Sequence, residues 1–162
     1  AGQTFDVTAE HPGLSEQITE VTPELLPVNE ALARFPVPVK LPTFLPEGFR
    51  MEETARLYLG FADYPDTLEL LYSTVLSDSG NISLRAFPES EISGSIVGTD
   101  SMEEVVINET LNGALVKGGW FENTRQWEDL DQWSLYWLQE GVRYSLTGAD
   151  PEVLIAVATS LE

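Results

Sequence analysis

The sequence predicts an α+β domain: a curved antiparallel β-sheet of about six or seven strands, covered by a C-terminal helix, with a short N-terminal helix and a proline-rich strap. Three observations support this fold class. Short segments of alternating polarity follow one another through the middle of the chain, without the strand–helix alternation of parallel βαβ units. Residues 133–147 have the pattern of a β-hairpin. Residues 150–161 have the pattern of a capped amphipathic helix.

The predicted hairpin contains a two-residue turn that ends at Gly141. With this turn, Trp137 faces Tyr144 across the hairpin. Leu135 then faces Leu146 on the same side. A three-residue turn would mix polar and apolar side chains on both faces, so the hydrophobic pattern selects the shorter turn. Gly141 supplies the positive φ that such turns need.

The C-terminal helix has a marked start and an apolar stripe. The Asp150 side chain can accept hydrogen bonds from the free N–H groups of the first turn. Pro151 fits the first helical position because no donor is needed there. The stripe repeats at helical spacing and comprises Leu154, Val157, Ala158 and Leu161. We expect this stripe to pack across the sheet that contains the hairpin.

The N-terminal part of the chain is predicted to lie outside the sheet. Residues 1–28 are polar, acidic and interrupted by prolines, which predicts an irregular arm or linker. Asn29 is expected to cap a short helix over residues 30–34. Residues 35–49 carry four prolines among apolar side chains, which predicts an extended strap over one edge or end of the sheet. The single predicted domain spans residues 29–162.

The strands are expected to begin after this strap. Most alternate apolar and polar residues, and the second segment is apolar enough to be buried on both faces. The strand-like segments that precede the hairpin are 51–59, 68–76, 81–87, 102–108 and 111–117. Residues 122–132 are polar and acidic, which predicts an insertion between the sheet and the hairpin.

The composition limits the classes of partner. With 27 acidic and 8 basic residues, the chain has a net charge of −19, so nucleic acid and anionic membrane surfaces are poor partners. Hydrophobic residues make up 43% of the chain, which argues against disorder. No cysteine is present, which excludes disulfides and cysteine metal sites. No apolar run approaches the ~18 residues of a membrane span, so no direct insertion of this segment is expected.

The sequence contains no recognisable catalytic constellation, and we predict no catalytic residue, metal site or cofactor. The one histidine, His11, lies in the acidic arm, no second imidazole is present for a zinc site, and no G-x-S-x-G nucleophile elbow occurs. The best candidates for ligand contact are two tryptophans and three acids beside or within the polar insertion: Trp120, Trp127, Glu128, Asp129 and Asp131. They could contact an apolar ligand, a sugar or calcium. The alternative is a solvated acidic loop with its tryptophans in the core.

Several segments resemble the DUF4367 family: residues 29–39, 41–49, 111–118 and 136–148, with a terminal helix that closes in Ala-Thr-Ser-Leu. The resemblance covers most of residues 29–162. It implies a domain of unknown function, usually extracytoplasmic, often following a membrane anchor and sometimes attached to anti-sigma-type regulators. The family also looks distantly similar to outer-membrane lipoprotein carriers and sigma-regulatory proteins built from a half-barrel sheet. No catalytic residue can be transferred, because the family has none assigned.

These observations predict a non-enzymatic extracytoplasmic binding or sensing module, such as the outer part of a membrane-anchored regulator, whose partner is another protein or an apolar small molecule. The alternative is a carrier of a lipid or other apolar ligand in the concave face of the sheet. A hydrolase is a third and poorly supported hypothesis. The chain starts at Ala1 without a leader, so the native N-terminus is expected to be missing. The oligomeric state stays open.

Overall fold

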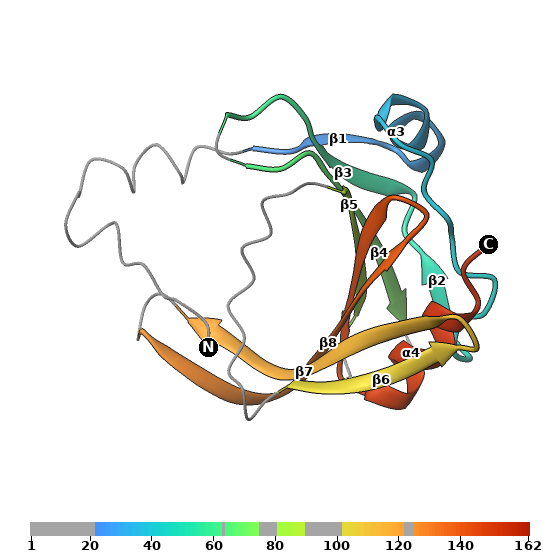
Figure 1. The fold of residues 1–162 in the computed structure, drawn as a ribbon. Helices are drawn as coiled ribbons and strands as arrows, with labels where there is room; N and C mark the ends of the chain where they lie inside the picture. The colour runs from blue at the N-terminus through green and yellow to red at the C-terminus, as the bar shows by residue number, and fades with distance from the viewer. Residues whose placement is uncertain (1–21, 63, 75–80, 90–101, 122–124) are drawn as a thin grey trace.

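The computed structural model describes residues 22–62, 64–74, 81–89, 102–121 and 125–162 (Figure 1). Within these ranges the strands are β1 (Glu24–Pro27), β2 (Phe49–Met51), β3 (Thr54–Tyr58), β4 (Thr67–Thr74), β5 (Ile82–Pro88), β6 (Met102–Asn108), β7 (Leu111–Phe121), β8 (Gln126–Gln139) and β9 (Val142–Gly148). The helices are α3 (Val28–Arg34) and α4 (Pro151–Thr159). The α+β class and the antiparallel sheet are confirmed. The predicted number of strands was too low, since the described residues form nine.

All strands belong to one curled sheet, in the order β1-β3-β4-β5-β9-β8-β7-β6, with β2 paired to β4 (Figure 1). The chain builds it as two antiparallel runs, β3-β4-β5 and β6-β7-β8-β9. The last strands of the two runs pair with each other, so that Leu84 faces Leu146 and Ala86 faces Tyr144. The C-terminal strand β9 therefore lies in the middle of the sheet.

The hairpin β8–β9 has the predicted register. Trp137 is opposite Tyr144, and their rings stack with centroids 5.2 Å apart and an angle of 14° between planes. The turn residues Glu140 and Gly141 both have positive φ, 51° and 79°, as a type I′ turn requires. This turn matches the right-handed twist of the strands, so the hydrophobic pattern and the turn select the same register.

Helix α4 also begins as predicted. The Asp150 carboxylate accepts a hydrogen bond from the Glu152 N–H at 3.0 Å, and Pro151 occupies the first turn. Leu154 and Val157 are fully buried against β8 and β9. The predicted stripe ends differently, because Leu161 lies beyond the helix.

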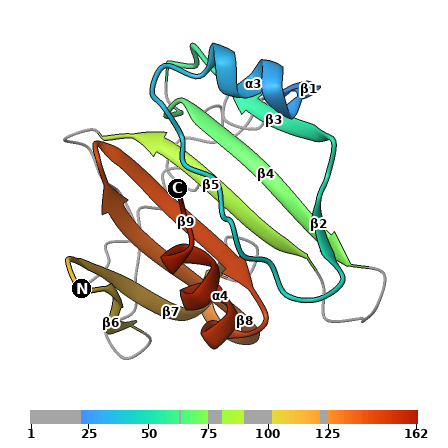
Figure 2. The same cartoon turned by 90° about the vertical axis from the view of Figure 1, so that its right-hand side faces the viewer.

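The proline-rich strap crosses the same face of the sheet as α4, from α3 to β2 (Figure 2). Its middle pairs with the C-terminal tail: Pro42 bridges Leu161, while Leu41 and Glu162 exchange backbone hydrogen bonds of 3.2 and 3.0 Å. The prediction of an extended strap is therefore confirmed, and its expected place at an edge or end is corrected. The tail residues that follow α4 supply the backbone partners that hold the strap across the face.

Two predictions for the N-terminal segment were wrong. Residues 24–27 are a strand instead of part of an irregular arm, because they pair with β3 and place Leu26 opposite the buried Ala55. Helix α3 begins directly after Pro27 without a side-chain cap, so Asn29 lies inside the first turn. The rest of the expected arm, including His11, lies outside the described residues.

The predicted strand over residues 51–59 is interrupted. It forms β2 and β3, which pair with successive parts of β4. At the break, the Val28 N–H of α3 donates to the Glu53 carbonyl at 3.1 Å. The start of the helix thus takes a backbone acceptor that a continuous strand could have used.

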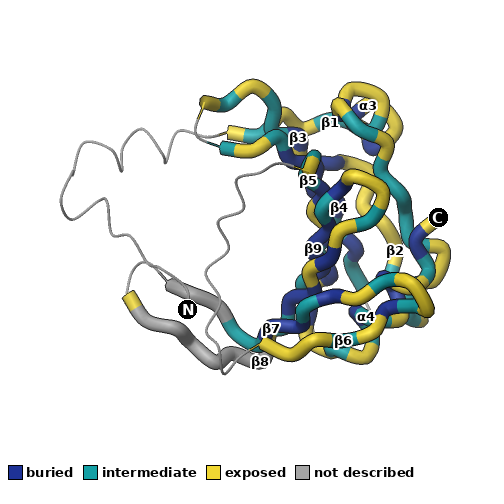
Figure 3. Tube along the Cα trace, in the orientation of Figure 1, coloured by how far each residue is buried: buried dark blue, intermediate teal, exposed yellow. Residues whose placement is uncertain are grey.

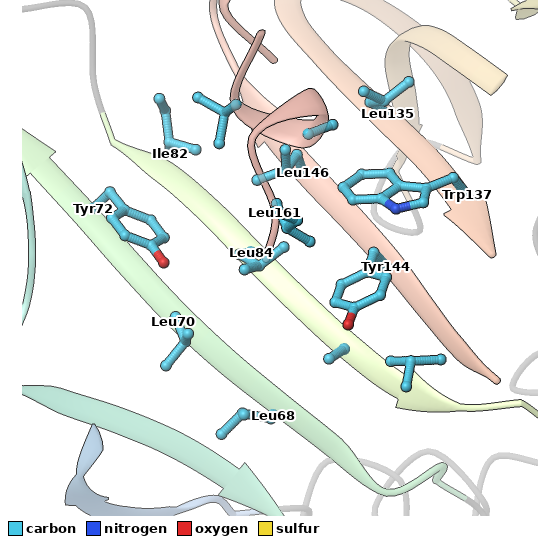
Figure 4. Close-up of a cluster of buried hydrophobic side chains, with 14 of the residues drawn as sticks. Leu68, Leu70, Tyr72, Ile82, Leu84, Leu135, Trp137, Tyr144, Leu146 and Leu161 are labelled. Atoms are coloured by element: carbon cyan, nitrogen blue, oxygen red, sulfur yellow. The ribbon is translucent and has the colours of Figure 1, made fainter. Parts of the chain in front are cut away.

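The buried apolar residues of the described ranges form one hydrophobic core, which lies between the sheet and the layer formed by α3, the strap and α4 (Figure 2). The buried residues run along the middle strands β4, β5 and β9 (Figure 3). Two tyrosines, Tyr72 and Tyr144, lie among the side chains of this core (Figure 4). Their hydroxyl groups have different polar environments. The Tyr144 hydroxyl accepts a hydrogen bond from the Lys40 backbone N–H at 3.0 Å. The Tyr72 hydroxyl is buried and has no hydrogen-bond partner among the described residues.

We predict opposite effects for the two tyrosine-to-phenylalanine changes. Tyr72→Phe removes an unpaired buried hydroxyl and should raise the free energy of unfolding by about 1 kcal/mol. Tyr144→Phe leaves the Lys40 N–H without its acceptor and should lower the free energy of unfolding by about 1 kcal/mol. Urea denaturation of both variants measures these changes. A loss of stability in Tyr72→Phe would show that its hydroxyl is hydrogen-bonded.

We also predict a loss of stability at alkaline pH. Burial raises the pKa of Tyr72 from 10.0 to about 12, so the folded protein keeps this proton after the unfolded chain has released it. The contribution of Tyr72 to the free energy of unfolding is therefore fully present below about pH 10. It is lost as the pH rises towards 12, by about 2–3 kcal/mol. Denaturant titrations at a series of pH values measure the slope. Tyr72→Phe should reduce that slope, and an unchanged slope would contradict the assignment.

Candidate binding site

The sheet face that points away from α3, the strap and α4 carries a row of mostly polar side chains. Strand pairing places Arg56, Glu69, Arg85, Ser145 and Tyr136 side by side on β3, β4, β5, β9 and β8. We call this face the polar face. It includes the continuation of the row through Leu25 on β1 and through Ala114 and Glu104 on β7 and β6, together with the side chains two residues before and after each member. Because side chains alternate along a strand, the neighbours of these residues enter the core on the other side.

The centre of the row is a carboxylate held between two guanidinium groups. Arg56 Nη1 donates to Glu69 Oε1 at 3.1 Å, and Arg85 Nε donates to Glu69 Oε2 at 2.6 Å. Only 3% of Glu69 is exposed, whereas the two arginine side chains are 47% and 46% exposed. Such charge-assisted hydrogen bonds are short and directional, so they fix the positions of both guanidinium groups.

This cluster has a positive charge of one unit in a strongly acidic chain. Glu69 is the one acidic partner of Arg56 and Arg85 among the described residues. Tyr58 lies nearby, and its pKa is raised above 10.0, first by burial and then by the Glu69 carboxylate. Both oxygens of Glu69 already accept hydrogen bonds, so the arrangement suits the binding of an anion better than general-base catalysis.

The polar face also carries most of the exposed large apolar side chains. Seven such side chains are found among the described residues, and five of them lie on this face: Leu25, Met102, Val106, Tyr136 and Leu138. The other two, Phe44 and Met51, lie on the strap and on β2. Tyr136, Leu138, Met102 and Val106 lie on β8 and β6, towards one edge of the sheet, whereas Leu25 lies on β1 at the opposite edge. Exposed apolar side chains grouped on one part of a face are typical of an interaction surface.

The predicted ligand residues lie where β7 ends and β8 begins. The backbone of Trp120 pairs directly with that of Trp127, and Gly119 pairs with Glu128. The expected polar insertion was placed wrongly, since residues 126–132 belong to strand β8. Polar composition suggested a loop, but pairing with β7 continues the strand here. The side chains of Trp120, Trp127, Glu128, Asp129 and Asp131 lie outside the described part, so their role stays a prediction.

The ladder between these strands contains a large irregularity. Lys117 pairs with Trp133 before it, and Gly119 pairs with Glu128 after it. One residue of β7, Gly118, therefore stands opposite residues 129–132 of β8. Gly118 has a φ of 77°, which a glycine adopts without steric cost. Asp129 and Asp131 belong to this bulge, and the pairing of β7 with β8 resumes beyond it at Gly119 and Glu128.

A hollow lies on the opposite side of the sheet, near the start of α4. Its volume is about 190 Å³, and its walls are mainly apolar, with Pro46, Phe49, Ile82, Val153 and Leu154 among them. Among the described residues that line it, Asn81 and the capping Asp150 are the ones with polar side chains. The polar face therefore has the more distinctive chemistry of the two.

The sequence reasoning missed the arginine–glutamate cluster. A signal was present, because Glu69 interrupts an apolar run that was expected to be buried on both faces, and a buried carboxylate needs cationic partners. Identifying Arg56 and Arg85 as those partners required the register of three strands.

Comparison of the chain with protein-family models, with curated proteins and with solved structures finds no match. The likeness to the DUF4367 family therefore stays a prediction that rests on the quoted motifs. In the described part of the chain, no three His, Cys, Asp or Glu side chains are grouped as metal ligands would be. None of the described helices has the length and apolar character needed to cross a membrane.

We predict that Glu69→Gln destabilises the fold. The amide removes the charge that faces both guanidinium groups and presents N–H donors to other donors, so the free energy of unfolding should fall by about 1–3 kcal/mol. Glu24→Gln is the matched control, because Glu24 makes an exposed ion pair with Arg34 at 2.7 Å. The control should have a much smaller effect, since surface pairs are screened by water. Equal losses in urea denaturation would contradict a structural role for the buried pair.

Proposed function

We propose that this protein is a non-enzymatic binding or sensing module that binds its partner through the polar face. The observation that carries the proposal is the asymmetry of the sheet: one face packs on the core, while the other bears five of the seven exposed large apolar side chains of the described residues. Large apolar side chains contribute most to binding when a partner removes them from water.

The polar face has the composition of a recognition surface. Tyr136 and Leu138 project from β8, a central strand of the second antiparallel run, and are 39% and 44% exposed. The arginine–glutamate cluster lies two strands away on the same face. An apolar area beside a fixed charged group is the usual arrangement by which a surface gains both affinity and orientation.

The proposed location is outside the cytoplasm, as the outer part of a membrane-anchored regulator. This part of the proposal rests on the resemblance of residues 29–162 to the DUF4367 family. The absence of cysteine is compatible with any redox compartment.

The second candidate function is a carrier of a lipid or another apolar ligand. It is favoured by the exposed Met102 and Val106 on β6, which add apolar side chains to the same face on either side of Glu104. A carrier binds a small molecule here, whereas a sensing module can bind a protein on the same surface.

A native mass spectrum compared with the denatured chain mass tests both functions. We expect a bound species in the native protein and in Phe44→Ser, which changes an exposed apolar residue of the strap. The double variant Tyr136→Ser/Leu138→Ser should lose it. A small added mass identifies a carrier, and a protein-sized mass identifies a partner. A native mass equal to that of the bare chain would contradict the carrier function, and retention by the double variant would contradict binding through the polar face.

A further inference from the structure

The arginine–glutamate cluster has unused hydrogen-bonding capacity that faces outwards. A guanidinium group has five N–H donors in a fixed fork. Arg85 reaches Glu69 through Nε, and Arg56 reaches it through Nη1. Because about half of each arginine side chain is exposed, the remaining donors can reach a ligand from solvent.

The charge of the cluster defines the charge of its ligand. Two guanidinium groups and one buried carboxylate leave one positive charge, which a single anionic group would neutralise. The two arginines extend from strands on either side of β4 and converge on one carboxylate. An anion placed over this carboxylate could therefore accept hydrogen bonds from both guanidinium groups, as carboxylates and phosphates do at paired arginines.

The apolar part of the polar face begins beside this cluster. Along the row, the small Ser145 separates Arg85 from the exposed Tyr136, which lies two strands, or about 10 Å, away. Leu138 follows on the same face of β8, opposite Arg143 of β9, and Val106 lies on β6, opposite Asn112 of β7. A ligand that contacts both the cluster and these apolar side chains needs a charged group at one end and an apolar part beside it.

The end of the row on β6 determines which way such a ligand is oriented on the polar face. Beyond Tyr136 the row continues through Ala114 to Glu104, which is exposed on β6. A carboxylate there repels an anionic group, whereas the arginines attract it. The net charge of −19 repels anions over longer distances, but that repulsion is screened beyond about 8–10 Å in physiological salt.

We propose that the polar face binds a single-chain amphiphile with one anionic head group. The head lies on Arg56 and Arg85, which Glu69 positions, and the apolar chain lies over Tyr136 and Leu138. This inference rests on the proposed function and specifies its ligand. The head group is a carboxylate, as in a fatty acid, or a phosphate, as in an alkyl phosphate.

Isothermal titration calorimetry with three probes of equal chain length tests this proposal: dodecanoate, dodecyl phosphate and uncharged dodecanol, each below its aggregation concentration. We expect the anionic probes to bind at least about tenfold more tightly than dodecanol, and the tighter of the two identifies the head group. Arg56→Gln and Arg85→Gln should each weaken anion binding by about tenfold, with little effect on dodecanol. Arg85→Lys keeps the charge without the planar fork and should lie between these values.

Arg34→Gln is the matched control, because it removes the same charge from an ion pair on α3 and should leave binding unchanged. Tyr136→Ser/Leu138→Ser should weaken the binding of all three probes. Equal affinity for dodecanol and the anionic probes, or an equal loss in Arg34→Gln, would overturn the proposal. If neither anionic probe binds while the native mass spectrum shows a species that the double variant loses, the ligand class is wrong and the proposed function stands.

Discussion

Pairing between β5 and β9 is the interaction on which the rest of the structure depends. It joins the two antiparallel runs into one sheet and brings the C-terminal strand to its centre. Helix α4 then packs against β9, β8 and β6, and the tail that follows it pairs with the strap at Leu41. Since the side-chain period of a strand is two residues, a one-residue slip at β5–β9 would turn Arg85 towards the core and Leu84 towards solvent.

The two faces of the sheet meet different physical requirements. The core face packs large apolar side chains such as Leu84 and Leu146 under α4 and the strap. The polar face buries one carboxylate, Glu69, and compensates it with two half-exposed guanidinium groups. Removing a partner from such a pair is costly, so the cluster holds its geometry without a ligand. A rigid cation beside exposed apolar side chains gives the face an orientation that an apolar patch alone would lack.

The acidic composition gives this cluster its contrast with the rest of the surface. Only 8 of the 162 residues are basic, and two of them converge on one carboxylate. A long-range negative field keeps the chain soluble and disfavours polyanions, while a local positive site still accepts a single anionic group. The proposed function and the proposed ligand class use the same face, and neither requires a catalytic residue.

The sequence by itself determined the features that depend on local patterns. Alternation and a Gly141 turn specified the register of β8–β9, and Asp150 with Pro151 specified the start of α4, because these signals act over a few neighbouring residues. Tertiary structure decided that residues 24–27 form an edge strand, that residues 126–132 extend β8, and which strands flank β4. The cluster at Glu69 belongs to this second class. Its arginines are 13 and 16 residues away in the chain, and only sheet pairing brings them together.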